Sequence, residues 1–269
     1  GGIVSEALAG PGFQGKRGQT LALSTPGNHC RELVLVGLGI PEEFDLEVWR
    51  RAVANGIAKA RQRGSSKIAV PLPEIDGHDS EELSIAATEA AILTSYRYRE
   101  FKAAPPEFVE LKEILLAAPV NIAAATMRAQ KVADATCWAR DLVNTPSNMK
   151  RPDSLAENAR EMAVETGLEF EIIDSGKAQQ LGLNALLAVG QGSSVGPRLV
   201  ILEHRTMGAT GQPTVIVGKG ITFDTGGISL KPAQKMGDMK ADMSGAAAVF
   251  GTMQALANLD AQRWVVGVT

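Results

Sequence analysis

Residues 214–259 read TVIVGKGITFDTGGISLKPAQKMGDMKADMSGAAAVFGTMQALANL, and this stretch decides the fold. Thr214–Val217 is a short apolar run that ends at Gly218, which is typical of a buried strand. Ser244–Leu259 is rich in alanine and other small residues, which predicts a helix that packs closely on a sheet. Trp264–Val268 is a further apolar run. A strand, a long loop, a helix and a second strand together predict an α/β unit.

The same alternation of strands and helices extends through the rest of the chain. Apolar runs predict strands, and apolar residues at every third or fourth position predict helices. The predicted strands are 20–23, 31–36, 67–72, 169–173, 186–189 and 198–203, and the predicted helices are 44–62, 80–97, 151–167 and 176–181. The stretches 108–111 and 114–118, after a turn at Pro105-Pro106, stay open between strand and mixed structure. The alternation predicts a largely parallel, doubly wound sheet in each α/β block.

One long segment separates the two blocks. Asn121–Val143 reads NIAAATMRAQKVADATCWARDLV and contains neither Gly nor Pro, so its length and alanine content predict one continuous helix. A long helix between two α/β blocks is a natural connector between domains. The sequence therefore predicts an N-terminal α/β domain at 1–120, a linker helix at 121–143 and a second α/β block at 144–269.

The composition is that of a globular protein, with 45% apolar and 21% charged residues. The net charge of −3 argues against electrostatically driven nucleic-acid binding by the whole chain. No apolar run reaches the roughly 18 residues of a membrane span, so no transmembrane helix is expected. Cys30 and Cys137 form no C-x-x-C pattern, and both are expected to be buried thiols in a protein of a reducing compartment.

The loop between the predicted strand 214–217 and the predicted helix 244–259 contains the candidate catalytic and metal-binding residues. Lys219 and Asp224 follow the strand end, Lys231 follows the turn at Gly226-Gly227, and Asp242 directly precedes the helix. Ligands of open α/β sheets lie outside the carboxyl ends of strands. Carboxylates suit Zn²⁺, Mn²⁺ or Mg²⁺ and can bridge two ions, while an ammonium group can stabilise charge on a carbonyl oxygen. Spacing alone leaves a two-metal hydrolytic site evenly balanced against ordinary turn, cap and surface roles.

The sequence of this loop also resembles a known signature. VGKGITFDTGGISLKP, followed by MKADMSGAAAV, closely resembles the catalytic-domain signature of the leucyl aminopeptidase family, which are cytosolic two-metal exopeptidases. ARDLVNTPSN at 139–148 is similar to the family's junction between linker helix and catalytic domain, and residues 1–20 are similar to its N-terminal domain. The resemblance implies a macro-like α/β fold for 1–120 and the first part of a doubly wound catalytic metallopeptidase domain for 144–269.

The resemblance assigns roles to five residues of the loop. Lys219 matches a lysine that binds one metal ion, Asp224 matches a carboxylate that bridges both ions, and Asp242 matches a terminal carboxylate ligand. Lys231 matches the catalytic lysine that contacts the scissile carbonyl oxygen. Met239 matches a residue that lines the pocket for the first side chain of the substrate, and an ordinary core methionine is the alternative.

The function implied by the resemblance is that of a cytoplasmic, metal-dependent aminopeptidase. It would release N-terminal leucine or other bulky apolar residues from peptides. The implied cofactors are two divalent ions, Zn²⁺ or Mn²⁺ or both, with bicarbonate in the full-length enzyme, and the implied assembly is a homohexamer. The alternative is a family member that acts as a DNA-binding regulatory or architectural protein, which ranks lower because residues 1–120 hold no dense basic run.

Part of the family pattern does not occur in this chain. The stretch N-T-D-A-E-G-R, which supplies the remaining carboxylate ligands and an arginine, is absent, and His29, His78 and His204 lack the paired spacing of metal ligands. The chain starts without Met and stops inside a predicted strand, so we expect a fragment of a longer protein. Three ligands are too few to hold two ions in closed coordination shells, so we expect this piece alone to lack peptidase activity.

Overall fold

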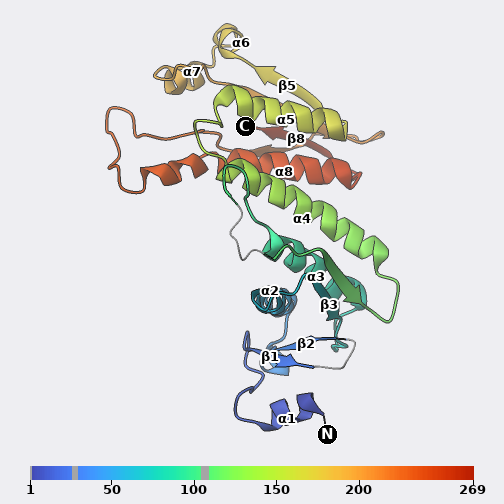
Figure 1. Cartoon of the computed structure of the whole chain (residues 1–269). Helices are drawn as coiled ribbons and strands as arrows, with labels where there is room; N and C mark the ends of the chain where they lie inside the picture. The colour runs from blue at the N-terminus through green and yellow to red at the C-terminus, as the bar shows by residue number, and fades with distance from the viewer. Residues whose placement is uncertain (1, 26–29, 104–108) are drawn as a thin grey trace. The chain divides into compact units, whose positions relative to one another are not determined.

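The computed structural model describes residues 2–25, 30–103 and 109–269 of the chain. The chain divides into two compact units, Gly1–Ala133 and Asp134–Thr269. The boundary between them falls inside the long helix α4 (Ala123–Asn144), which is drawn in light green in Figure 1. No helix in the described ranges is both long enough and apolar enough to cross a membrane.

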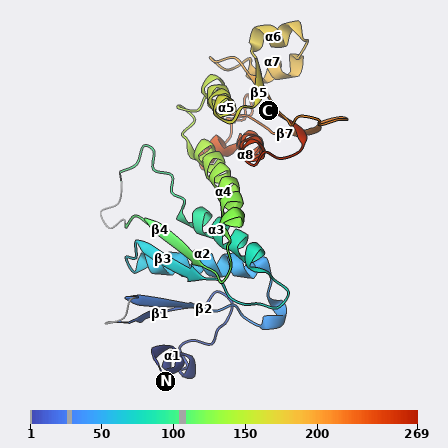
Figure 2. The same cartoon turned by 90° about the vertical axis from the view of Figure 1, so that its right-hand side faces the viewer.

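The first unit combines two separate two-stranded sheets with helices (Figure 2). Strands β1 and β2 pair antiparallel, with Thr20 opposite Val36, whereas β3 and β4 pair parallel, with Lys67 opposite Glu113. The elements of this unit before α4 are α1 (Ile3–Ala9), β1 (Thr20–Ser24), β2 (Glu32–Val36), the 3-10 helix η1 (Pro41–Glu43), α2 (Leu46–Gln62), β3 (Lys67–Pro71), α3 (Ser80–Ser95) and β4 (Glu113–Ala117).

Helices α2 and α3 pack against each other in the core of the first unit. Each begins after an aspartate whose carboxylate accepts a hydrogen bond from a backbone N–H three residues later, at 2.7 Å for Asp45 and 2.8 Å for Asp79. Such caps satisfy amide groups that have no partner inside the helix. Trp49 of α2 is only 7% exposed, and its indole Nε1 donates to the carbonyl oxygen of Leu83 at 2.9 Å. This hydrogen bond fixes how the two helices face each other.

The second unit is built on one four-stranded sheet in the order β5-β6-β8-β7. Strands β5 and β8 both pair antiparallel with β6, and β7 pairs parallel with β8, with Val217 opposite Val268. The elements of this unit after α4 are α5 (Pro152–Thr166), β5 (Glu169–Ile173), α6 (Ser175–Gln180), α7 (Asn184–Gly190), β6 (Leu199–Arg205), β7 (Thr214–Val217), the 3-10 helix η2 (Met236–Ala241), α8 (Ser244–Asn258) and β8 (Trp264–Val268).

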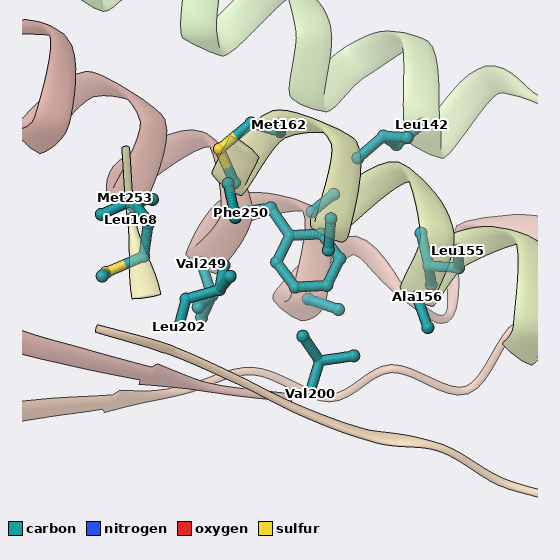
Figure 3. Packing of buried hydrophobic residues seen from close by; sticks show 14 of the residues in the cluster. Leu142, Leu155, Ala156, Met162, Leu168, Val200, Leu202, Val249, Phe250 and Met253 are labelled. Carbon is teal, nitrogen blue, oxygen red and sulfur yellow. The ribbon is translucent and has the colours of Figure 1, made fainter. Parts of the chain in front are cut away.

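Helices α5 and α8 cover one face of this sheet and enclose the core of the second unit (Figure 3). Phe250 of α8 is 1% exposed and lies over Val200 of β6. Burial of a side chain of this size contributes roughly 1.5–3 kcal/mol. Gly267 lets α8 approach β8, because a Cβ at that position would lie 2.7 Å from Cγ1 of Val249. Close packing of the helix of small residues on the sheet, as predicted from its composition, is confirmed.

The mixed α/β class is confirmed, and the strands at 169–173, 214–217 and 264–268 have the predicted bounds. The prediction of largely parallel sheets was wrong, because β1–β2, β5–β6 and β6–β8 are antiparallel. A parallel crossover needs a connection of about a dozen residues or more. Residues 206–213 between β6 and β7 are too few for one, so β7, and β8 parallel to it, run opposite to β6. The connection at 174–198 between β5 and β6 is long enough for either direction, and its two short helices return the chain to the sheet end at which β5 finishes.

Other local predictions were also wrong or lay open. The run Leu186–Val189, predicted as a strand, forms part of helix α7. None of the residues of α7 is buried, so no packing in the core favours a strand there. Cys30 is exposed, and Cys137 is half-buried. The open stretch after residue 109 contains strand β4, whereas Pro105, Pro106 and residue 108 lie outside the described residues. The helices α1, η1 and η2 had not been predicted from the sequence.

Candidate active site

The predicted site residues lie on the loop between β7 and α8. The two ends of this loop approach each other closely at Gly218 and Gly245. A Cβ at Gly218 would overlap the carbonyl oxygen of Gly245, and a Cβ at Gly245 would lie 2.6 Å from the backbone nitrogen of Lys219. The backbone N–H of Ala246 donates to the carbonyl oxygen of Lys219 at 2.9 Å. The end of β7 and the first turn of α8 are therefore in direct backbone contact, which only glycine permits here.

This contact brings Lys219 and Asp242 together. Nζ of Lys219 lies 2.7 Å from Oδ1 of Asp242. The lysine side chain is 60% exposed, whereas that of the aspartate is 19% exposed. The second oxygen of Asp242, Oδ2, is buried and has no hydrogen-bond partner among the described residues. A buried carboxylate oxygen without a partner is costly, and a bound cation would satisfy it.

Asp224 and Lys231 form a second cation–carboxylate pair on the same loop. Nζ of Lys231 lies 2.7 Å from Oδ2 of Asp224, and the backbone N–H of Gly226 donates to Oδ1 at 2.8 Å. The hydrogen bond from Lys231 is the main cause that holds the pKa of the Asp224 carboxyl below its usual range, followed by the N–H of Gly226. The charge of Lys219 lowers this pKa further. Lys219 therefore acts electrostatically on both carboxylates.

The turn between Asp224 and Lys231 requires glycine. Gly226 has φ +90°, and a Cβ there would overlap the carbonyl oxygen of Ser229. The backbone N–H of Lys231 donates to the carbonyl oxygen of Thr225 at 2.9 Å, which closes the turn. The turn that the sequence predicts at Gly226-Gly227 therefore returns Lys231 to Asp224, and Gly226 is the residue at which the close backbone approach requires glycine.

Met239 lies on η2, three residues before Asp242, and is half-buried. The backbone N–H of Asp242 donates to the carbonyl oxygen of Met239 at 3.2 Å. The following residue, Met243, is completely buried and anchors the start of α8 in the core. The structure therefore places Met239 next to the second carboxylate, on the turn that leads into α8.

The donor set fits a divalent cation in part. Two carboxylates and a lysine amine are suitable ligands, and the partnerless Oδ2 of Asp242 is an open donor. Within the described ranges, however, no group of three or more His, Cys, Asp and Glu side chains could hold a metal ion. His204 is instead buried, with Nε2 2.8 Å from the carbonyl oxygen of Ala261, and His29 lies outside the described residues. Lys219, Asp224 and Asp242 therefore supply only part of a coordination shell.

Sequence reasoning missed one residue close to this loop. Lys150 is 2% exposed, and its Nζ donates to the carbonyl oxygen of Lys240 at 2.9 Å, two residues before Asp242. Its place before Arg151 and Pro152 at a predicted helix start is typical of a solvated lysine. Only the fold shows that its side chain turns inward beneath η2.

Comparisons with known proteins cover nearly the whole chain. Residues 1–105 match the model of the cytosol aminopeptidase family, N-terminal domain, and residues 137–269 match that of the cytosol aminopeptidase family, catalytic domain. A probable cytosol aminopeptidase of Syntrophotalea carbinolica is 39% identical over 267 residues, which cover 96% of this chain and 54% of the relative. One of Desulfovibrio desulfuricans is 41% identical over 266 residues, which cover 95% and 53%, respectively. The chain thus spans about half the length of the curated relatives it matches.

Solved structures give the same picture. The bottromycin maturation enzyme BotP in complex with Mn superposes with a TM-score of 0.86 at 32% identity, over 100% of this chain and 56% of that one. A mutant of tomato leucine aminopeptidase superposes with a TM-score of 0.83 at 28% identity, over 99% and 52%. The folds of both units therefore resemble the corresponding parts of these proteins.

Proposed function

Because this chain belongs to the cytosol aminopeptidase family, we propose that it forms part of a metal-dependent aminopeptidase that releases N-terminal residues from peptides. The observation that carries this proposal is the pair of ion pairs on one loop, Lys219 with Asp242 and Lys231 with Asp224. Residues 1–120 form the N-terminal domain in this proposal, 121–143 the linker helix and 144–269 the first part of the catalytic domain.

Three residues are proposed as metal ligands. Asp224 would serve both of two divalent ions, Asp242 would hold one of them through the oxygen that lacks a partner, and Lys219 would bind through its neutral amine, because an ammonium group has no lone pair. Two ions of Zn²⁺ or Mn²⁺ would polarise the scissile carbonyl group and lower the pKa of a water molecule. The solved structure of BotP contains Mn, which supports a divalent ion. Further ligands and a bicarbonate site belong to the full-length enzyme in this proposal.

Lys231 is proposed as the catalytic lysine. Its ammonium group is oriented by Asp224 and is 36% exposed, so it can donate a hydrogen bond to a substrate. The carbonyl oxygen of a peptide gains negative charge when water attacks, and a fixed ammonium donor stabilises that charge. The role of Lys231 is therefore to hold a proton donor at the position of the developing oxyanion.

Met239 is proposed to line the pocket for the first side chain of the substrate. Its flexible, polarisable side chain is half-buried beside Asp242, which suits contact with leucine and other bulky apolar residues. Peptides are the substrates, and a cytoplasmic homohexamer is the assembly that we propose for the full-length enzyme. The relatives described above are named as aminopeptidases, so the DNA-binding alternative gains no support.

The direct test is Lys231→Ala in the intact protein, assayed with leucine p-nitroanilide and Mn²⁺. Loss of one oxyanion donor is expected to lower kcat by about 10²–10³-fold. Lys235→Asn is the matched control, because Lys235 is an exposed lysine of the same loop with φ +61°, a conformation that asparagine tolerates. An undiminished kcat in the alanine variant would reject the role of Lys231. The 269-residue chain alone, with three ligands, is expected to hydrolyse no substrate.

A further inference from the structure

The second unit buries a charged side chain for which the proposed reaction has no use. Lys150 is the one Lys, Arg, Asp or Glu classed as buried in the part of the chain that the structure describes, and it is 2% exposed. Taking an ammonium group out of water costs several kcal/mol unless it is hydrogen-bonded. An apolar side chain of similar volume would fill the same space without this desolvation cost. Burial of this lysine therefore points to a purpose other than packing.

All three protons of the Lys150 ammonium group have an acceptor. Nζ lies 2.7 Å from the carbonyl oxygen of Leu142, 3.2 Å from that of Val143 and 2.9 Å from that of Lys240. Leu142 and Val143 lie in the last turn of α4, where carbonyl groups have no partner inside the helix. A cation at this end of a helix is favoured by the helix dipole. The third acceptor belongs to a different element, η2.

The link between α4 and η2 is made twice. While the side chain of Lys150 binds the backbone of Lys240, the side chain of Lys240 binds the carbonyl oxygen of Asn144 at 3.0 Å. Lys150, from the segment between α4 and α5, bridges carbonyl groups of α4 and η2, while Lys240 of η2 binds the end of α4 directly. The position of η2 is fixed against the end of α4 by these bonds.

The turn η2 leads directly to the proposed metal ligand Asp242. Lys240 lies two residues before it, and the N–H of Asp242 binds the carbonyl oxygen of Met239 on the other side of Lys240. A shift of η2 would therefore move the carboxylate of Asp242 away from Lys219, which lies 2.7 Å from Oδ1. Hydrogen bonds that orient a metal ligand are typically worth 10–100-fold in metal affinity.

We propose that Lys150 is a positioning residue, which fastens η2 to the end of α4 so that Asp242 is presented to the metal site. This role rests on the proposed function, because it concerns the same site. Desolvation, followed by the charge of Lys240, lowers the pKa of Lys150 to about 8. The desolvation of Lys150 is unfavourable, but this is the position from which its hydrogen bonds can hold η2 and, through η2, the proposed ligand Asp242.

The experiment is Lys150→Met in the intact protein, with Mn²⁺ affinity measured by isothermal titration calorimetry. Methionine fills a similar volume but cannot donate, so Mn²⁺ affinity is expected to fall 10–100-fold. The melting temperature is expected to fall as well, because three backbone acceptors lose their donor, but by no more than in the core variant described below. Lys177→Met removes an exposed lysine of the same unit and is expected to leave the affinity unchanged. Val200→Ala leaves a gap in the core and is expected to lower the melting temperature without a matching loss of affinity.

Each result bears on the proposal. Mn²⁺ affinity within twofold of the wild type in Lys150→Met overturns it, as does an equal loss in Val200→Ala, which would assign the effect to general destabilisation. If the methionine variant does not fold, Lys150→Gln decides, since its amide can donate only two of the three hydrogen bonds. At least threefold weaker binding is expected for it, and unchanged binding overturns the proposal. Absence of Mn²⁺ binding in the wild type overturns the proposed function itself, which separates the two failures.

Discussion

Lys231 and Asp224 meet across a closed turn, with 2.7 Å between Nζ and Oδ2. Both side chains are about one-third exposed, at 36% and 34%, so the pair faces solvent along one side. Because the lysine lowers the pKa of the Asp224 carboxyl, this group stays ionised further into acid than a free aspartate. The proposed catalytic lysine is therefore held in place before any substrate arrives, and the proposed bridging ligand is kept in the form that binds metal.

Gly226→Ala is expected to open this turn. The added Cβ would overlap the carbonyl oxygen of Ser229, and φ +90° is strained for alanine. In the intact protein we expect kcat/KM for leucine p-nitroanilide to fall at least 10-fold, because Lys231 is displaced. Gly227→Ala is the control, since its φ is also positive, +70°, but a Cβ there meets nothing within 4 Å. Equal losses in the two variants would mean that strain, rather than closure of the turn, causes the effect.

Gly245→Ala is expected to separate the end of β7 from α8. A Cβ there would lie 2.6 Å from the backbone nitrogen of Lys219, and backbone atoms cannot move aside as a flexible side chain can. We expect the free energy of unfolding to fall by about 1–3 kcal/mol, as in other overpacked sites. Urea denaturation measures this. Gly192→Ala meets no atom within 4 Å and should change stability little, so a comparable fall there would contradict the explanation.

The sequence was sufficient for the parts of the fold that depend on local patterns. The limits of β5, β7 and β8, the end of α2 and the start of α3 have the predicted positions. Local signals such as Asp79 before α3 and Gly218 after β7 mark them. The predicted start of α2 lies two residues too early, and the predicted end of α3 lies two residues too late. The direction of each strand within its sheet could not be predicted, because the same apolar run can pair with its neighbour in either direction. The helical state of Leu186–Val189 was missed for a similar reason, since a short apolar run has no distinct period.

The candidate site residues were named from the resemblance to the leucyl aminopeptidase family, whereas the structure shows which of them form ion pairs. Lys219, Asp224, Lys231 and Asp242 were named from the sequence, but their pairing follows from the Gly218–Gly245 contact and the Gly226 turn. These are contacts between residues distant in the sequence, or depend on a positive φ, and no periodicity reports them. The burial of Lys150 was beyond prediction because its acceptors are backbone carbonyl groups, which every residue has.

Stability is expected to depend on pH through Lys150. Its pKa is about 8 in the folded protein, below the value of 10.5 for an unperturbed lysine, so between these values the unfolded chain binds more protons. Stability from this group therefore rises with pH through that window, by up to about 3 kcal/mol. Urea denaturation of wild type and Lys150→Met at pH 7.5 to 10 measures the difference. A difference in stability that stays constant over this range would contradict the shifted pKa.

The two cysteines are expected to differ in reactivity. Cys30 is exposed, whereas Cys137 is half-buried, and burial raises the pKa of the Cys137 thiol above its usual range. Because the thiolate is the reactive form, iodoacetamide at pH 8 should modify Cys30 first and Cys137 at least 10-fold more slowly. Mass spectrometry of Cys30→Ser and Cys137→Ser variants separates the two rates. The rates should converge in urea, and equal rates in the folded protein would contradict the burial of Cys137.

The contact between Gly218 and Gly245 has a consequence for how this region can change during evolution. Lys219 and the start of α8 are joined through their backbones, so the distance between them does not depend on the composition of the residues that lie between. Substitutions at exposed loop positions such as Ile228 and Leu230 can accumulate without moving either end. The exposed loop positions without a proposed role are therefore free to diversify, while the two glycines are confined to a single residue type.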